Sequence, residues 1–241
     1  MISDPLSQEG YHVKFGWGPN ALKRLGATAD TIVLVDVLSF TTAVDIATAS
    51  GATIFPFGFG NDNAADYAAE QKAVLAGSRD GDGFSLSPSS LTRIDPGTRL
   101  VLPSPNGAEL SLLAESLDRT VVAACLRNAG AVAKGLMSRG TIAVIAAGER
   151  WDDGSLRPAV EDLLGAGAVI ASTPAKSRSP EAEVAASAFL ATESHLGETL
   201  REAMSGRELI DRGFAADVEL AADLNASTTF PLMIQGFFSS P

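Results

Sequence analysis

Short apolar runs alternate with alanine-rich stretches along most of this 241-residue chain. Residues 31–37, 120–125 and 141–147 have the length and the apolar content of buried strands, and the stretches between them have a helical pattern. Strands that alternate with helices are typical of an α/β layered fold. The chain is long enough for one large domain of this kind with a substantial core, or for two small ones.

The other elements are predicted from the same patterns and from the residues at their boundaries. Further strands are expected over residues 52–57 and 99–103. Helices are expected over residues 41–50, 61–76, about 108–117, 129–139 and about 160–172. Residues 77–96 are rich in glycine, serine and aspartate, so they are predicted to form a long loop.

The composition of the chain changes near residue 172. Residues 172–180 form a polar connection that contains two prolines, and two helical stretches follow at residues 181–195 and about 196–205. Little strand pattern is present after them. We therefore expect about residues 181–241 to be helical and to pack on the sheet, within a single domain over residues 1–241.

Composition and charge restrict the partners and the compartment. Apolar residues make up 46% of the chain and charged residues 20%, as in a soluble globular protein. The net charge is −11 and no basic run is present, so binding to nucleic acid is not expected. The apolar runs are too short for a membrane span, and the first residues lack the features of a signal peptide. The single cysteine, Cys125, is expected to be a buried core residue and favours a cytoplasmic protein.

Acidic residues lie at the end of one predicted strand and at the start of one predicted helix. Asp36 ends the first predicted strand, and Glu161 and Asp162 open a helix that begins 125 residues later. In an α/β sheet, ligands bind outside the carboxyl ends of the strands, and oxygen ligands without histidine or thiolate suit Mg²⁺. We expect Asp36, Glu161 and Asp162 to hold Mg²⁺, and Glu161 to be the direct ligand of the adjacent pair. The alternative is that Asp36 caps a helix and that the pair stabilises a helix N-terminus.

Polar residues near the same strand ends could bind an anionic substrate. These candidates are Thr41, Thr42, Arg79, Asn106, Gly107 and Asn128. The threonines lie where a helix N-terminus would meet an anion, the arginine could clamp a phosphate, and the asparagines could present an amide to it. Each has a structural alternative: helix capping for the threonines and Asn128, an ordinary turn for Asn106 and Gly107, and a solvated loop position for the arginine.

Several familiar phosphatase mechanisms do not fit the sequence. A haloacid dehalogenase needs a second aspartate two residues after the first, where Leu38 follows Asp36. A cysteine phosphatase needs Cys-x5-Arg, and Cys125 has Ala131 at the arginine position. The phosphate-binding P-loop motif and the dinucleotide fingerprint are absent from the sequence. With only two histidines in the chain, a Ser-His-Asp or a zinc mechanism is not expected.

Several segments, in the same order over roughly residues 32–231, resemble the 2-phosphosulfolactate phosphatase family, the ComB-type phosphatases of coenzyme M biosynthesis. They are Asp36-Val-Leu-Ser-Phe-Thr-Thr42, Gly77-Ser-Arg-Asp-Gly-Asp-Gly-Phe-Ser-Leu-Ser-Pro88, Ser104-Pro-Asn-Gly107, Leu126-Arg-Asn-Ala129, Ala147-Gly148 and Glu161-Asp162-Leu-Leu-Gly-Ala-Gly167, with a tail that includes Ser205-Gly-Arg-Glu-Leu209 and Phe230-Pro231. The resemblance implies a three-layer α/β/α sandwich. It also implies Mg²⁺-dependent hydrolysis of 2-phospho-3-sulfolactate to 3-sulfolactate and phosphate. The catalytic residues that we expect on this basis are Asp36, Asn106, Asn128 and Glu161.

Two positions depart from the family pattern. Ser39 stands where the first motif usually has an arginine, and Ser78 stands where the long loop usually has a glutamate. The sulfonate and the carboxylate of the implied substrate need cationic partners, so the loss of an arginine bears directly on substrate choice. Arg127, next to Asn128, is a candidate for the replacement charge.

Three functions are therefore considered. The first is hydrolysis of 2-phosphosulfolactate, the second is hydrolysis of another small 2-phospho-hydroxy acid by the same fold, and the third is anion binding without turnover. We expect the first, with attack on phosphorus by metal-activated water rather than by Asp36. A homodimer is expected from the family alone.

Overall fold

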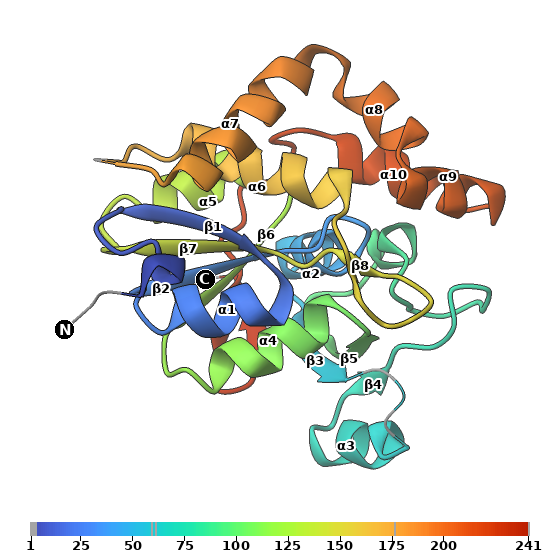
Figure 1. Ribbon diagram of the computed structural model, residues 1–241. Helices are drawn as coiled ribbons and strands as arrows, with labels where there is room; N and C mark the ends of the chain where they lie inside the picture. Colours follow the sequence, from blue (N-terminus) through green and yellow to red (C-terminus); the bar gives the residue numbers. More distant parts are fainter. Residues whose placement is uncertain (1–3, 59, 61, 176, 241) are drawn as a thin grey trace.

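The computed structural model describes residues 4–58, 60, 62–175 and 177–240. The predicted bounds at residues 1, 61 and 241, and Lys176 in the predicted connection, lie outside this part. The described strands form one nine-stranded sheet in the order β1-β7-β2-β6-β10-β11-β3-β5-β4, and a separate two-stranded ribbon (Figure 1). The sheet strands are β1 (Val13–Trp17), β2 (Thr31–Val35), β3 (Thr53–Gly58), β4 (Val74–Leu75), β5 (Arg99–Ser104), β6 (Thr120–Ala124), β7 (Ile142–Ala146), β10 (Leu232–Ile234) and β11 (Phe237–Ser239). The ribbon consists of β8 (Glu149–Arg150) and β9 (Leu156–Arg157).

Two groups of parallel strands make up the sheet. Strands β1, β7, β2 and β6 form one group, and β3, β5 and β4 form the other. The antiparallel hairpin of β10 and β11 joins them, between β6 and β3. In β2, Val33 and Val35 belong to one buried cluster, whereas Ile32 and Leu34 belong to another. Since successive side chains point to opposite faces of a sheet, both faces of this strand are apolar and both need a cover of helices.

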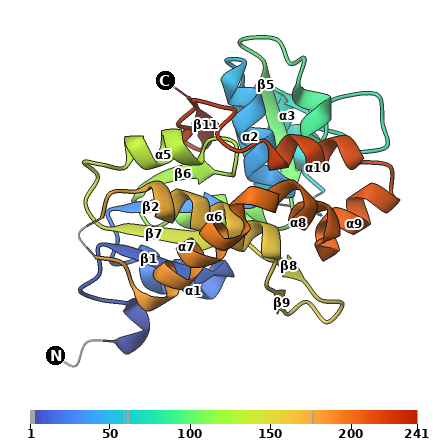
Figure 2. The ribbon, with the colours of Figure 1, turned by 90° about the horizontal axis from the view of Figure 1, so that it is seen from above.

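Helices cover both faces of the sheet, as Figures 1 and 2 show. One face packs against α5 (Ala129–Gly135), α6 (Val160–Ser172) and α7 (Pro180–Thr192), and the other packs against α1 (Gly18–Gly26), α2 (Phe40–Ala49) and α4 (Gly107–Glu115). Helices α6 and α7 approach closely at Gly167, where a Cβ would lie 2.2 Å from the carbonyl oxygen of Ala185. The arrangement confirms the three-layer α/β/α sandwich.

The C-terminal part differs from its prediction. Helices α8 (Leu196–Glu202), α9 (Met204–Asp211) and α10 (Ala215–Ala222) follow α7, but residues 232–239 then form β10 and β11 in the middle of the sheet. The prediction of a helical segment over about residues 181–241 was therefore wrong at its end. Each strand has three residues, which is too short for a periodic pattern. The turn residues Gln235 and Gly236 have φ angles of 51° and 86°, as a two-residue hairpin turn requires.

Smaller differences lie elsewhere in the chain. Strand β1 and helix α1 precede the first predicted strand, in a region for which no element was predicted. Helix α3 (Ala64–Glu70) is shorter than the predicted helix over residues 61–76, because β4 occupies the end of that stretch. The predicted loop over residues 77–96 contains a 3-10 turn at Pro88–Leu91. Among the described helices, none combines the length and the apolar character that crossing a bilayer requires.

Candidate active site

Asp36 lies just after β2, and its carboxylate accepts hydrogen bonds from the first residues of two helices, α2 and α4. Its Oδ1 accepts a hydrogen bond from the backbone N–H of Phe40 (3.2 Å), and its Oδ2 accepts one from the backbone N–H of Gly107 (2.7 Å). A Cβ at position 107 would lie 2.6 Å from Oδ2 of Asp36 and 2.5 Å from the Phe40 ring, so only glycine allows this approach. Asp36 and Gly107, both predicted site residues, are thus brought together.

Asp162 is held by backbone groups from two strand ends. It lies in the first turn of α6, where its Oδ1 accepts from the N–H of Val37 (2.7 Å) and its Oδ2 accepts from the N–H of Gly148 (2.8 Å). Both carboxylate oxygens therefore fix the loops that follow β2 and β7. This placement favours a structural role for Asp162.

Glu149 is a site residue that the sequence reasoning missed. It follows β7 directly after Gly148, and its Oε2 accepts a hydrogen bond from the Asn106 side-chain amide (2.9 Å). Burial and, after it, the nearby charge of Asp36 together raise the pKa of Glu149 to about 7. The signal was present in the sequence, because Glu149 is a strand-end acid of the same kind as Asp36.

Carboxylates accumulate around these strand ends, three of them buried and that of Glu149 half-buried. Asp36, Glu149, Glu161 and Asp162 lie within electrostatic reach of one another. Burial raises the pKa of Asp36 to about 6, and the charge of Glu161 adds to the effect, while the N–H groups of Phe40 and Gly107 oppose it. Burial also raises the pKa of Asp162 well above its ordinary value, with contributions from Asp36 and Glu161. Burial and the neighbouring acids thus favour the protonated forms of Asp36, Glu149 and Asp162.

The fit of a metal ion to these residues depends on how many ligands it needs from the protein. Within the described residues, no three acidic, histidine or cysteine side chains are placed to hold one metal ion. This differs from the predicted ligand set of Asp36, Glu161 and Asp162. Asp36 and Glu149 nevertheless line the same cleft. Mg²⁺ commonly takes only one or two carboxylates and completes its shell with water and substrate phosphate, so this pair fits Mg²⁺.

The cleft combines these acids with two arginines. It has a volume of about 190 Å³, and its walls include Asp36, Ser39, Arg79, Asn106, Glu149 and Arg212. A second cavity of about 390 Å³ adjoins it and shares Asn106 and Glu149 as lining residues. A space of this size, with acids on one wall and guanidinium groups on another, suits a small molecule that carries several negative charges.

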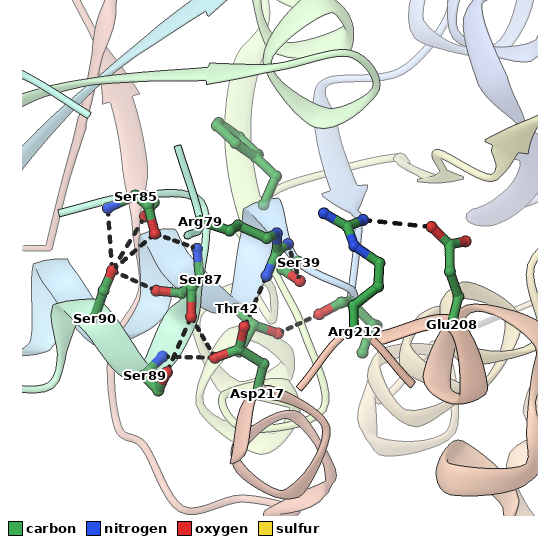
Figure 3. A network of polar contacts seen from close by, with 12 residues as sticks. Ser39, Thr42, Arg79, Ser85, Ser87, Ser89, Ser90, Glu208, Arg212 and Asp217 are labelled. Atoms are coloured by element: carbon green, nitrogen blue, oxygen red, sulfur yellow. Dashed lines mark hydrogen bonds and ion pairs between the residues drawn. The ribbon is translucent and has the colours of Figure 1, made fainter. Parts of the chain in front are cut away.

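Arg79 is fixed in the cleft wall by a network of serines around Asp217 (Figure 3). Its Nη1 lies 2.7 Å from Oδ2 of Asp217, and its Nη2 donates to the hydroxyl of Ser39 (2.8 Å). Asp217 is buried, and its Oδ1 accepts from the hydroxyl of Ser87 (2.7 Å) and from the backbone N–H of Ser89 (2.9 Å). The predicted long loop is therefore folded around the arginine, whose guanidinium is presented in a defined orientation.

Two predicted threonines shape the backbone around Asp36. The Thr41 hydroxyl donates to the Asp36 carbonyl oxygen (2.7 Å) and accepts from the Asp36 N–H (2.9 Å). The Thr42 hydroxyl donates to the Val37 carbonyl oxygen (2.7 Å). Both threonines are buried and lie inside α2, whose N-cap position is Ser39, so their hydrogen bonds fix the loop after β2 and do not cap the helix. Their predicted contact with substrate stays a prediction.

Arg127 and Asn128 lie in a different polar cluster. Arg127 forms ion pairs with Asp45 (3.0 Å) and Asp223 (3.3 Å). Asn128 is buried, and its side chain accepts from the Cys125 N–H (2.9 Å) and donates to the Ala123 carbonyl oxygen (3.3 Å). Neither residue is among those that line the cleft. Their predicted roles in binding and catalysis stay predictions. Asn128 occupies the N-cap position of α5, as its structural alternative has it, but its side chain makes no capping hydrogen bond to the helix.

Comparisons with known proteins place the chain in one family. A model of the 2-phosphosulpholactate phosphatase family matches residues 19–236. A protein of Carboxydothermus hydrogenoformans named "Probable 2-phosphosulfolactate phosphatase" is 32% identical over 219 residues, which cover 88% of this chain and 89% of the relative. Relatives with the same name from Thermotoga maritima and Gloeobacter violaceus are 26% and 28% identical over 219 residues, covering 86% and 85% of this chain and 91% and 88% of the relatives. The chain therefore belongs to the 2-phosphosulpholactate phosphatase family.

Proposed function

We propose that this protein is a Mg²⁺-dependent phosphatase that hydrolyses 2-phospho-3-sulfolactate to 3-sulfolactate and phosphate. The observation that carries the proposal is the cleft in which the carboxylates of the buried Asp36 and the half-buried Glu149 lie with the guanidinium groups of Arg79 and Arg212. Membership of the family supports the substrate. This activity would give the protein a place in coenzyme M biosynthesis.

Asp36 and Glu149 are the residues that would hold Mg²⁺. When bound, the ion supplies positive charge for the phosphoryl oxygens and lowers the pKa of water. Two backbone N–H groups fix the Asp36 carboxylate, and the Asn106 amide fixes that of Glu149. Such fixed orientations reduce the reorganisation needed to reach the transition state. Glu161 adds negative charge near both ligands and strengthens the attraction for a cation.

We propose water, and not Asp36, as the nucleophile. Water attacks phosphorus, the bond between phosphorus and the C2 oxygen breaks, and the leaving C2 oxygen takes up the proton that the attacking water gives up, which yields sulfolactate and phosphate. Both oxygens of Asp36 already accept backbone hydrogen bonds, which makes the carboxylate a weaker nucleophile. Labelled phosphate trapped on Asp36 after an acid quench would contradict this mechanism.

One observation favours a second candidate substrate. Ser39, which stands where the family usually has an arginine, has its hydroxyl engaged by Arg79. The cationic groups of the cleft are therefore Arg79 and Arg212. A 2-phospho-hydroxy acid with a carboxylate and no sulfonate needs fewer cationic partners and is the alternative substrate.

The test is phosphate release from racemic 2-phosphosulfolactate, measured with Mg²⁺ and with a chelator, for the wild-type protein and for Glu149→Gln. We expect Mg²⁺-dependent turnover that falls by about 100-fold or more in the variant. Asp152→Asn, which changes an exposed acid of the β8–β9 connection, is the matched control and should keep wild-type activity. Turnover of 2-phospholactate alone would favour the second substrate, and no turnover of either ester would favour an anion-binding protein.

The compartment and the assembly are also proposals. Burial raises the pKa of the Cys125 thiol to about 12, so this cysteine is unreactive, in agreement with its predicted place in the core. We propose a cytoplasmic protein because the sequence has this single cysteine. The homodimer is proposed from the family alone, and sedimentation analysis of the purified protein would test it.

A further inference from the structure

Two arginines that line the cleft each lie close to the same aromatic ring, that of Phe214. The Cζ atom of Arg79 lies 5.7 Å from the centroid of the Phe214 ring, and the Cζ atom of Arg212 lies 5.6 Å from it. An aromatic face attracts cations, so one ring helps to hold two like charges close together. Both side chains line the cleft that contains Asp36 and Glu149.

The two arginines differ in how firmly the protein holds them. The Arg79 side chain is 12% exposed and is fixed by Asp217 and Ser39. The Arg212 side chain is 50% exposed, and its ion pair with Glu208 is long, with 3.5 Å between Nη1 and Oε1 (Figure 3). A guanidinium has five N–H donors, so this contact leaves most of the donors of Arg212 for another partner.

The charges around Arg212 point to an anionic partner. Burial lowers the pKa of Arg79, the charge of Asp217 opposes this effect, and the positive charge of Arg212 adds to it, so the two guanidinium groups repel each other. An anion placed between or beside them would remove this repulsion. The acids Asp36 and Glu149 on the cleft wall would repel the same anion unless a cation covered them.

We propose that Arg212 is a specificity-determining residue that binds the second acidic group of the substrate, a carboxylate or a sulfonate. This inference rests on the proposed function and deepens it. The substrate would place its phosphoryl group toward Asp36 and Glu149 and its other acidic group toward Arg212, with Arg79 as the fixed neighbour. The planar guanidinium fork matches the oxygens of both acidic groups.

The test compares three esters in Arg212→Ala and Arg212→Lys. 2-Phosphosulfolactate has a carboxylate and a sulfonate, 2-phospholactate has only the carboxylate, and isopropyl phosphate has neither. In Arg212→Ala we expect KM to rise roughly 10- to 100-fold for the substrate whose acidic group Arg212 binds, with kcat changed less than about twofold. KM for isopropyl phosphate should stay the same. Arg212→Lys should recover part of the loss, because it keeps the charge without the fork.

The two acidic groups are told apart by which esters respond. A rise for both 2-phospholactate and 2-phosphosulfolactate assigns the carboxylate to Arg212, and a rise for 2-phosphosulfolactate alone assigns the sulfonate. Arg207→Ala is the matched control, because Arg207 is an exposed arginine of α9 that pairs with Glu202. An unchanged KM for every ester in Arg212→Ala, or an equal rise for all three, would overturn the inference.

A binding measurement separates this inference from the proposed function. Titration calorimetry with 3-sulfolactate and with inorganic phosphate needs no turnover. We expect Arg212→Ala to raise the Kd for 3-sulfolactate by about 10-fold or more and to leave the Kd for inorganic phosphate unchanged. In one outcome, the wild-type protein hydrolyses no ester while Arg212→Ala still has a higher Kd for 3-sulfolactate than the wild-type protein. That result would support the anion subsite and contradict the proposed activity. Equal affinity of both proteins for 3-sulfolactate would contradict the subsite without contradicting the proposed activity.

Discussion

Glu161 and Asp162 are neighbours in the sequence, but their carboxylates do different things. Both are buried in the first turn of α6. The oxygens of Asp162 accept two backbone N–H groups, from Val37 and Gly148, whereas Glu161 acts on the site through its charge. Adjacent residues on a helix point about 100° apart, so one acid reaches the strand ends in a direction that the other cannot.

The role of Asp162 gives a prediction at the scale of one residue. In Asp162→Asn, one oxygen can still accept a backbone N–H, but the amide nitrogen faces the other N–H and leaves a buried donor without an acceptor. We expect a loss of about 2–3 kcal/mol in the free energy of unfolding, measured by urea denaturation. Asp152→Asn, at an exposed acid, should change it by less than about 0.5 kcal/mol. Equal stability of both variants would show that the Asp162 hydrogen bonds contribute little.

The sequence predicted some of the cleft correctly and for a clear reason. Asp36, Arg79 and Asn106 line it, because residues just after strands gather at the ends of a layered sheet. Arg127 lies elsewhere because a buried acid, Asp45, pairs with it, and no local pattern in a sequence identifies a partner 82 residues away. Arg212 was missed for the same reason, since its relation to the cleft depends on where α9 packs.

At the scale of elements, the hairpin of β10 and β11 supports the site from the centre of the sheet. Phe238 of β11 is fully buried, pairs with Ile54 of β3, and packs edge to face against Phe40 with 6.3 Å between ring centroids. Phe40 in turn donates its backbone N–H to Asp36. A strand only three residues long therefore connects the C-terminal part to the position of the Asp36 carboxylate.

This connection predicts the effect of truncating one side chain in the hairpin. Phe238→Ala should lower the free energy of unfolding by about 3–5 kcal/mol, because it leaves a cavity beside Phe40. Ile234→Ala, in the same hairpin but at a position that is 46% exposed, is the matched control and should cost much less. Guanidinium denaturation of both variants measures the difference. Similar losses in the two variants would mean that the hairpin contributes by its backbone pairing and not by its buried ring.

The hairpin also shows what a sequence pattern can reveal about elements. The alanine-rich helices and the five-residue strands have periodic patterns, and the three-layer fold follows from them together with the family resemblance. The strands β10 and β11 have no such pattern because each is three residues long. Their position between β6 and β3 depends on contacts with residues more than 100 positions earlier in the chain.

At the scale of the whole molecule, the fold brings acids from distant segments into one buried region. Asp36 follows β2, Glu149 follows β7, and Glu161 begins α6. Each acid is compatible with the element beside it. The charge of Glu161 raises the pKa of Asp36, and the charges of Asp36 and Glu161 raise the pKa of Glu149. Folding without a cation therefore brings these acidic groups close together. We expect part of the stability of the protein to depend on pH and on Mg²⁺.

The sign of the pH effect follows from the pKa values of Asp36 and Glu149 in the folded protein, about 6 and about 7, which lie above the ordinary values of 3.8 and 4.5. Between pH 4 and pH 8 the folded protein holds more protons on these groups than the unfolded chain does. In a chelator, the free energy of unfolding should therefore fall as the pH rises from 5 to 8, by on the order of 3 kcal/mol per group as an upper limit.

Thermal and urea unfolding at pH 5, 6.5 and 8, each with chelator and with millimolar Mg²⁺, measure this dependence. The variant with both Asp36→Asn and Glu149→Gln lacks two of the groups whose pKa values are raised, so its stability should change less over the same range, with Asp162 as the remaining group. Mg²⁺ binds the ionised folded state, so it should restore the stability of the wild-type protein at pH 8, have little effect at pH 5, and have none on the double variant. A wild-type stability that rises from pH 5 to pH 8 in chelator would contradict the assignment of raised pKa values to these carboxylates. A normal pH dependence with no response to Mg²⁺ would contradict only the metal site, because the raised pKa values result from burial whether or not a cation binds there.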